Sequence, residues 1–261
     1  MRVALGLEYD GGRFCGWQSQ PSGCGVQDAL ERALAAIAGR FVRVAAAGRT
    51  DSGVHATAQV AHFDAPVERP LTAWVRGVNS ELPQGVAVLW AQPVADAFHA
   101  RFSATGRAYT YLLLNRASRP GLAAGRVGWF HRPLDVERMR AAASLLLGRH
   151  DFSAFRAAEC QANSPLRELR RVEIERRGEL VVFRFAADAF LQHMVRNLVG
   201  SLVYVGKGRH PPHWIGEVLA GRDRAAAAPT FAPDGLYLTA VEYDNAWGLP
   251  QPCAREPLVM A

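Results

Sequence analysis

The loop GRTDSG, at residues 48–53, contains a single acidic residue between two glycines. Asp51 lies in this loop with Arg49 two residues before it, and the loop holds no second carboxylate. A nearby guanidinium lowers the pKa of a carboxylate and keeps it ionised, as a nucleophile requires. Because Asp and Gly are also common turn residues, a hairpin turn beside a surface arginine is an equal alternative for this loop alone.

Residues 98–111, FHARFSATGRAYTY, interleave aromatic and basic side chains. If they form a strand, alternation places Tyr109 and Tyr111 on the same face. Aromatic faces stack on unpaired bases and arginines bind phosphates, which is how proteins hold single-stranded or flipped nucleotides. The alternative is an ordinary aromatic strand packed in a core.

Two more stretches are candidates for a functional role only in combination with the first. In residues 190–200, FLQHMVRNLVG, His193 and Arg196 flank an apolar helical stripe. Such residues are more often structural or solvated. Arg196 is therefore a candidate functional residue only if a carboxylate such as Asp51 faces it. Residues 8–18, EYDGGRFCGWQ, end an expected strand in glycines and also suit a plain connector.

Strands and helices alternate along the chain and must position these stretches. Period-two and helical apolar patterns predict strands at 2–9, 41–47, 58–64, 85–94, 107–114, 168–175, 179–186 and 235–243, and helices at 26–39, 71–78, 135–147, 189–205 and after Pro211. Paired strands beside helices favour an α+β fold over a parallel wound sheet. The pattern weakens over 95–104, so we expect domains at 1–99 and 100–247, with a Pro-rich tail at 248–261.

Composition predicts a folded, cytoplasmic protein. Hydrophobic residues make up 49% of the 261 residues, and no apolar run is long enough to span a bilayer. The first residues lack the apolar stretch and cleavage site of a signal peptide. The four cysteines show neither a CxxC pair nor a metal-ligand spacing, which predicts reduced thiols rather than a disulfide or a zinc site.

The charge is unevenly distributed. The chain has a net charge of +6, with −1 in residues 1–100 and +7 in residues 101–261. A basic half suggests a polyanionic partner. However, 29 of the 30 basic residues are arginine, a bias that a GC-rich genome also produces. The charge alone therefore does not establish nucleic acid as the partner.

These four stretches, taken in their order along the chain, resemble motifs of the tRNA pseudouridine synthase A family. DFSAFRAAECQ and DGLYLTAVEY are similar to two further motifs, so the resemblance covers about residues 3 to 244. It implies two related α+β halves with mainly antiparallel sheets flanking a basic active-site cleft, used as a homodimer. It also implies isomerisation of uridine to pseudouridine in the anticodon stem-loop of tRNA, at positions 38, 39 and 40, without a cofactor or metal and away from membranes.

The resemblance also assigns roles to residues. Asp51 would be the nucleophile, Tyr109 would stack on the target uracil, Arg196 would pair with Asp51, and Arg49 would enter the space left by the extruded base. Two segments would contact RNA: Phe98, His99, Ala100, Arg101 and Phe102, and the loop Glu159, Cys160, Gln161, Ala162 and Asn163. The family often has a basic residue near the end of the second segment, where this chain has Asn163.

The reaction chemistry agrees with a solitary acid. Uridine isomerisation breaks a glycosidic C–N bond and rejoins the uracil through carbon, so it exchanges no atoms or electrons with a cofactor, and one ionised carboxylate is enough. A glycoside hydrolase, the first alternative, would need two carboxylates about 5–10 Å apart. A non-catalytic RNA-binding module, the second alternative, would not need the aspartate loop.

Overall fold

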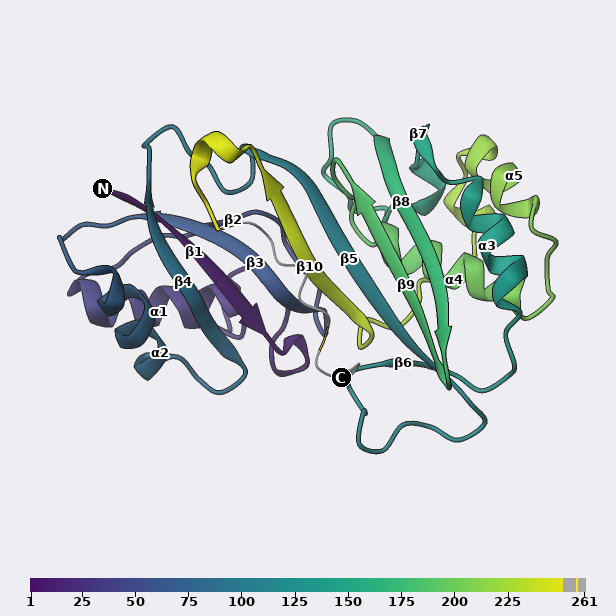
Figure 1. Cartoon of the computed structure of the whole chain (residues 1–261), viewed down its shortest axis with the longest axis horizontal. Coiled ribbons are helices and arrows are strands. Elements are labelled where there is room, and N and C mark those ends of the chain that lie inside the picture. Colours follow the sequence, from purple (N-terminus) through teal and green to yellow (C-terminus); the bar gives the residue numbers. More distant parts are fainter. Residues whose placement is uncertain (251–256, 258–261) are drawn as a thin grey trace. The chain divides into compact units, whose positions relative to one another are not determined.

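The computed structural model describes residues 1–250 and Pro257, and the chain folds as two compact units (Figure 1). The first unit combines Met1–Thr105 with the chain from Tyr237 onward, and the second is Gly106–Leu236. The last strand therefore belongs with the N-terminal unit, whereas the expected division grouped it with the second half. Beyond Pro250, the expected tail lies outside the described residues except for Pro257.

The first unit is built on a sheet whose strands follow the order β4-β1-β3-β10. Neighbouring strands are antiparallel except that β10 runs parallel to β3. The short β2 pairs antiparallel with His62 and Ala61 of β3. The bounds are β1 Arg2–Tyr9, β2 Ala45–Ala46, β3 His55–Asp64, β4 Val86–Val94 and β10 Leu236–Tyr243. Four of the expected strands are confirmed here, and the fifth, at 41–47, is reduced to two residues.

Glu31 binds the backbone just before β2. Its buried carboxylate accepts a hydrogen bond from the Val44 N–H (3.0 Å). A side chain from a helix thus satisfies a backbone N–H group that lies outside the strand.

Helices cover one face of this sheet (Figure 1). α1 spans Val26–Ala38, a π-helical turn η2 spans Ala73–Gly77, and α2 spans Val78–Glu81. Leu30 and Leu34, on the predicted apolar stripe of α1, are fully buried. Trp74 in η2 is also buried, with its ring edge-on to Phe63 at 5.1 Å. Both helices expected in this part of the chain are confirmed.

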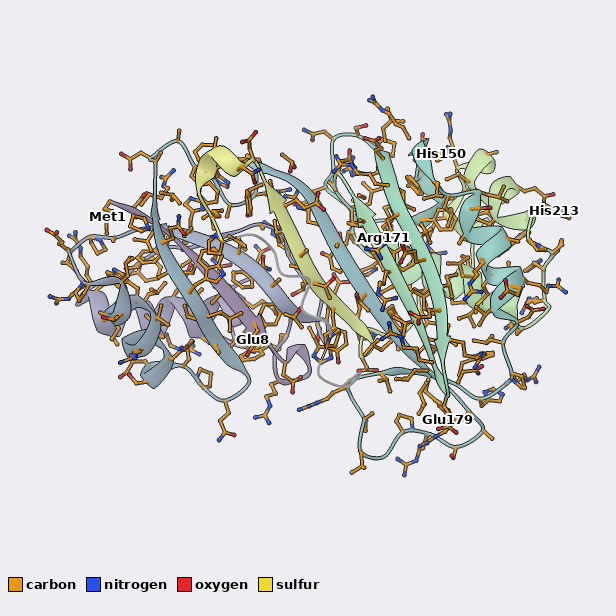
Figure 2. The ribbon with its side chains drawn as sticks, in the orientation of Figure 1. Met1, Glu8, His150, Arg171, Glu179 and His213 are labelled. Carbon is orange, nitrogen blue, oxygen red and sulfur yellow. A yellow bond between two sulfur atoms is a disulfide. The ribbon has the colours of Figure 1, made fainter. Side chains whose placement is uncertain are left out.

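The second unit has an antiparallel sheet in the order β5-β9-β8-β7, with β6 parallel to β5. The bounds are β5 Ala104–Asn115, β6 Gly128–Phe130, β7 Gly148–Asp151, β8 Leu166–Arg177 and β9 Leu180–Ala187. The predicted hairpin is confirmed, and Gly178 takes a φ of +59° at its turn, next to Glu179 (Figure 2). An α+β fold with mostly antiparallel sheets is confirmed.

Three helices belong to the second unit: α3 Val136–Ser144, α4 Met194–Gly206 and α5 Trp214–Gly221. The Asp135 carboxylate accepts a hydrogen bond from the Arg138 N–H (3.0 Å) and caps α3 at the predicted start. α4 begins at Met194 rather than near residue 189, because His193 adopts a left-handed φ of 61°. No helix within residues 1–250 is both long and apolar enough to cross a membrane.

Cys15 and Cys24 form a disulfide, so the prediction of reduced thiols is wrong for this pair. The Cys15 N–H donates to the Cys24 carbonyl (3.0 Å), which brings the two residues to a Cα–Cα distance of 5.5 Å. Sequence spacing gave no signal for this backbone contact. Cys160 has a free thiol, and Cys253 lies outside the described residues.

Candidate active site

Asp51 lies on a turn that leads into β3. The Val54 N–H donates to the Asp51 carbonyl (3.1 Å), and Gly53 completes the turn with a φ of +80°. Thr50 is buried, whereas Asp51 is half-buried and Arg49 is exposed. The loop is therefore a turn, as the simpler interpretation expected, and this turn leaves the carboxylate and the arginine accessible.

The glycine-rich stretch 8–18 packs directly against this loop. The Trp17 N–H donates to the Thr50 carbonyl (2.9 Å), and a Cβ at Gly16, whose φ is +95°, would lie 2.8 Å from the same oxygen. A Cβ at Gly11 would lie 1.9 Å from the Val54 carbonyl oxygen. These glycines permit close approach of two backbones, so the stretch supports the aspartate loop and is more than a connector.

A buried polar network fixes the loop from beneath. The hydroxyls of Tyr9 and Thr50 lie 2.8 Å apart, and the Gln59 amide donates to the Tyr9 oxygen (3.2 Å) and to the Gly48 carbonyl (2.8 Å). Burial raises the pKa of Tyr9 to about 12, so its phenol stays neutral. Bonds to Gly48 and Thr50 thus hold the backbone just before Asp51.

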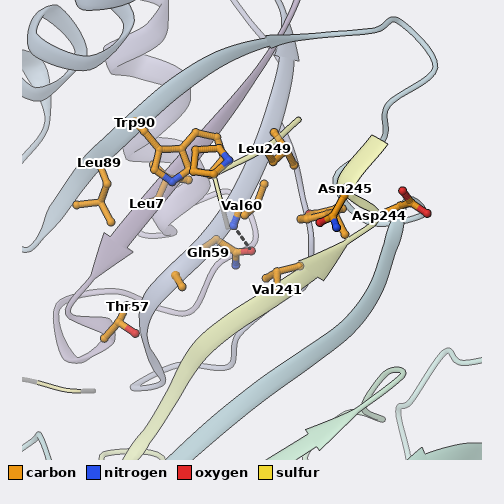
Figure 3. A pocket seen from close by; sticks show the side chains of 14 residues that line it. Leu7, Thr57, Gln59, Val60, Leu89, Trp90, Val241, Asp244, Asn245 and Leu249 are labelled. Carbon is orange, nitrogen blue, oxygen red and sulfur yellow. Dashed lines mark hydrogen bonds between the residues drawn. The ribbon is translucent and has the colours of Figure 1, made fainter. Parts of the chain in front are cut away.

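A hollow of about 120 Å³ opens beside this network, on the sheet of the first unit (Figure 3). Gln59, Trp90 and Asn245 are among its lining residues. The Trp90 ring occupies the space over Gly6, where a Cβ would lie 2.1 Å from the indole nitrogen. Asp51 does not line the hollow.

The backbone of segment 98–102 is anchored in the first unit. Phe98 and Ala100 are fully buried, and the Phe98 ring contacts those of Tyr243 and Trp247 at 5.3 and 5.4 Å. The Tyr243 hydroxyl donates to the Ala100 carbonyl (2.6 Å). Phe98 and Ala100 therefore do not present their side chains to solvent.

Arg101 and Phe102 form the exposed tip of the same segment. The Phe102 side chain is 77% exposed, and the Arg101 guanidinium carbon lies 5.7 Å from its ring centre. His99 is half-buried, and its Nδ1 accepts hydrogen bonds from the N–H groups of both tip residues (3.1 and 3.3 Å). The tip combines an aromatic face with a cation, the pair that binds unstacked bases and phosphates.

His62 supports this tip from β3. Its Nδ1 accepts a hydrogen bond from the Ala100 N–H (3.1 Å), and its ring lies edge-on to that of His99 at 4.7 Å. Burial, and then the positive charges of His99 and Arg2, lower the pKa of His62 to about 4. The ring is therefore neutral near pH 7, as its acceptor role requires.

In the second unit, Tyr109 lies on β5 opposite Phe185 of β9. It is half-buried, with its ring edge-on to Phe190 at 5.1 Å. Tyr111, by contrast, is fully buried, and its hydroxyl donates to the Ala232 carbonyl (2.8 Å). Of the two tyrosines predicted to share a face, Tyr109 is the one with exposed surface.

Arg196 lies in the first turn of α4, linked in both directions to Phe231. Its Nε donates to the Phe231 carbonyl (2.8 Å), and the Phe231 N–H donates to the Arg196 carbonyl (3.2 Å). Arg196 as a whole is half-buried. Side chain and backbone of Arg196 are thus tied to the segment that precedes β10.

Asn197, the next residue, is a buried hub with no exposed surface. Its amide donates to the Phe155 carbonyl (2.8 Å), and its oxygen accepts from the Arg224 guanidinium (3.1 Å) and the Thr230 hydroxyl (2.6 Å). This network fixes the segment around Phe231 against α4. Sequence analysis missed it, because an asparagine on an apolar helix gives no signal of its partners.

The loop at 159–163 lies in the second unit, after the short 3-10 helix Ser153–Phe155. Glu159, Gln161 and Asn163 are exposed, and Cys160 and Ala162 are half-buried. The loop is thus accessible.

The predicted residues divide between the two units. Arg49, Asp51 and segment 98–102 belong to the first, whereas Tyr109, Arg196 and loop 159–163 belong to the second. The pairing of Arg196 with Asp51 stays a prediction.

Comparison with known proteins places this arrangement in a family. The family model described as tRNA pseudouridine synthase matches residues 7–103 and 142–244, which include Asp51 and Arg196. The chain therefore belongs to the tRNA pseudouridine synthase family.

Relatives with the name tRNA pseudouridine synthase A match this chain along almost its whole length. The relative from Thiobacillus denitrificans is 64% identical over 98% of this chain and 99% of its own length. The relative from Dechloromonas aromatica is 66% identical over 97% of this chain and 96% of its own. The one from Methylobacillus flagellatus is 59% identical, with 96% of each chain covered.

Proposed function

We propose that this protein isomerises uridine to pseudouridine in tRNA, within the anticodon stem-loop at positions 38, 39 and 40. The observation that carries the proposal is Asp51, held on a rigid, accessible turn in a chain 64% identical to a named tRNA pseudouridine synthase A. No second acid lies in the GRTDSG loop, which suits an isomerisation better than a hydrolysis.

Asp51 carries the chemistry in this proposal. Its carboxylate attacks the substrate or removes the proton that starts an elimination, the glycosidic C–N bond breaks, and the uracil turns and rejoins the ribose through carbon. The ring carbon that forms the new bond loses its proton, the ring nitrogen that left the ribose gains one, and the carboxylate is regenerated. The bonds to Gly48 and Thr50 fix the backbone on the N-terminal side of the reacting group. Such positioning lowers the entropic cost of reaching the transition state.

The target uridine must leave its stack, at a cost of a few kcal/mol. The exposed part of the Tyr109 ring stacks on the uracil, and the exposed Arg49 enters the vacated space. The Arg101–Phe102 tip and loop 159–163 hold the RNA, while Phe98 and Ala100 support the tip from inside. Arg196 pairs with the Asp51 carboxylate and keeps it charged. The protein acts as a cytoplasmic homodimer.

The test is a tRNA transcript incubated with wild-type protein and then assayed for pseudouridine by mass spectrometry. Transcripts with cytidine at position 38, 39 or 40 assign the modified sites. Pseudouridine at these positions, lost in Asp51→Asn, is the expected result. Release of free uracil would indicate a glycoside hydrolase, and tight tRNA binding with unchanged RNA would indicate a binding module.

A further inference from the structure

The C-terminal end of α4 carries a basic and aromatic cluster that the proposed catalytic site does not use. We call it the α4-end patch and define it as Tyr204, Lys207, Arg209, His210 and Trp214, with Arg132 close enough to act on the charge of Lys207. Lys207 is the only lysine of the chain. Arg209 and Arg132 are exposed, and the other members are half-buried.

The rings of the patch are stacked, and two cations lie over one of them. His210 stacks on Trp214 at 4.0 Å between ring centres and lies parallel to Tyr204 at 6.2 Å. The Lys207 Nζ is 3.7 Å and the Arg209 guanidinium carbon 4.9 Å from the centre of the Tyr204 ring. The aromatic faces thus hold two positive charges close together.

Helix capping does not account for these cations. Basic side chains near a helix C-terminus often bind its last carbonyls. Here main-chain N–H groups satisfy those carbonyls at 2.9–3.0 Å: Lys207 to Val203, Arg209 to Tyr204, Gly208 to Val205 and Asp135 to Gly206. The charged groups of Lys207 and Arg209 are not needed for this purpose.

Neighbouring carboxylates do not neutralise the patch either. Within residues 1–250, no acidic side chain forms an ion pair with Lys207, Arg209 or Arg132. Burial lowers the pKa of Lys207, and the charges of Arg209 and Arg132 lower it further. Burial, Arg209 and Lys207 likewise lower the pKa of His210. Among the residues that the structure describes, these like charges have no acidic partner, and a bound anion would relieve their repulsion.

We propose that the α4-end patch binds phosphate groups of the tRNA backbone, outside the contacts made at the reacting base. This inference rests on the proposed function, because that function supplies the polyanion. Arg196 and Lys207 are eleven residues apart on one helix, about 16 Å at ~1.5 Å per residue. One bound RNA can therefore reach both ends of α4.

The experiment measures binding of an unmodified tRNA transcript as a function of salt, using the full chain. Each phosphate contact contributes about 0.9 to the log–log slope on duplex, so its loss weakens binding about eightfold at ~0.1 M salt. We expect two variants to flatten the slope of tRNA binding against salt by about one unit per lost contact. They are the double variant Lys207→Gln, Arg209→Gln and the single variant Arg132→Gln. KM for tRNA should rise while kcat at saturating tRNA stays unchanged, and Lys207→Arg should bind like wild type.

Arg116→Gln is the matched control. Arg116 is also an arginine of the second unit and is half-buried, but it pairs with Glu179 at 2.9 Å, at the turn between β8 and β9 (Figure 2). We expect it to leave the slope and KM unchanged. Thermal unfolding checks that each variant is folded, and exposed Arg132 provides a test that does not disturb the stacked rings.

Two results would overturn the proposal. The variants could lower the unfolding temperature yet keep the wild-type slope, in which case the cations only stabilise the helix end. They could also leave tRNA binding and KM untouched, which would point to a protein partner. Pseudouridine formation by wild type is scored separately, so failure of the proposed function is distinguishable from failure of the patch.

Discussion

Asp51 and Thr50 are neighbours with opposite environments. Thr50 turns inward to the Tyr9 hydroxyl, and Asp51 keeps exposed surface. The loop therefore separates the residue that anchors it from the residue proposed to react.

For Asp51→Asn we predict loss of pseudouridine formation with tRNA affinity within about twofold of wild type. The amide keeps the shape of the side chain but cannot act as an anionic nucleophile or base. Single-turnover assays and a binding titration measure the two effects. Turnover near the wild-type rate would exclude Asp51 as the reacting group.

Tyr109 is predicted to act through its ring. Tyr109→Phe keeps the stacking face and the contact with Phe190, whereas Tyr109→Ala loses stacking worth ~1–3 kcal/mol. The alanine variant should therefore have a rate roughly 5- to 150-fold below that of the phenylalanine variant. Rates for both at saturating tRNA provide the check, and equal losses would mean that the hydroxyl takes part in the chemistry.

His62 predicts a pH dependence of stability. Its folded pKa of about 4 lies below the unfolded value of 6.5, so the unfolded state binds the additional proton between these values. The stabilising contribution is complete above pH 6.5 and is lost as the pH falls toward 4. Asp64 and the Ala45 backbone favour the protonated ring, but burial and the charges of His99 and Arg2 outweigh them.

The free energy of unfolding should thus fall by a few kcal/mol at most between pH 6.5 and 4, at ~1.4 kcal/mol per pKa unit. Urea unfolding at several pH values measures this dependence. His62→Gln, which cannot titrate, should show a smaller change over the same range. An identical pH dependence in wild type and variant would refute the assignment.

At the scale of elements, α4 connects two proposed functional positions: Arg196, the proposed partner of Asp51, in its first turn and the α4-end patch at its last. The Asn197 hub decides where the first turn lies, because it binds Phe155, Arg224 and Thr230 together. The position of Arg196 depends on this network through its link to Phe231.

For Asn197→Ala we predict a loss of stability of ~2–5 kcal/mol, because several buried partners lose a hydrogen bond, each at ~1–3 kcal/mol before relaxation. kcat should fall more than KM rises, since Arg196 loses its support. Urea unfolding and steady-state kinetics provide the measurements. Ser144→Ala, on the exposed side of α3, should change stability by less than ~0.5 kcal/mol.

Sequence patterns predicted elements where local periodicity decides the structure. The α1 stripe of Leu30 and Leu34 and the hairpin at Gly178 are examples. The patterns failed where an unusual backbone angle decides, as at His193, whose left-handed conformation precedes the first residue of α4.

The same limit applies to the site. A solitary acid between glycines identified Asp51 as a candidate, but nothing local indicated that Gly16 and Gly11 pack against its loop. An aromatic and basic stretch suggested RNA contact, yet its Phe98 is fully buried. Which aromatic side chains face solvent depends on tertiary packing, and alternation alone does not determine it.

At the scale of the whole molecule, positive charge gathers in the second unit. Residues 106–236 contain 20 Lys and Arg against 12 Asp and Glu, a net charge of +8, which leaves −2 for the rest of the chain. This division is sharper than the split at residue 100, and it favours phosphate binding mainly by the second unit.

Arg101 and Arg196 should respond differently when replaced. Arg101→Ala should flatten the salt dependence of tRNA binding by about one unit, as expected for a lost phosphate contact. Arg196→Ala should instead change the pH–rate profile, because it removes the positive charge proposed to face the Asp51 carboxylate. A pH profile identical to wild type would make Arg196 another phosphate ligand.

The first unit is discontinuous in sequence, and this has a consequence for how it is made. β10 pairs with β3 through Tyr237 opposite His55, only four residues after Asp51, and the two rings stack at 4.6 Å. A ribosome releases residues 106–236 before it releases Tyr237 and the rest of β10, so the second unit can be complete while the first still lacks a strand. Translation that stops before Tyr237 therefore leaves the Asp51 loop on an unfinished sheet, even when every loop residue has been synthesised.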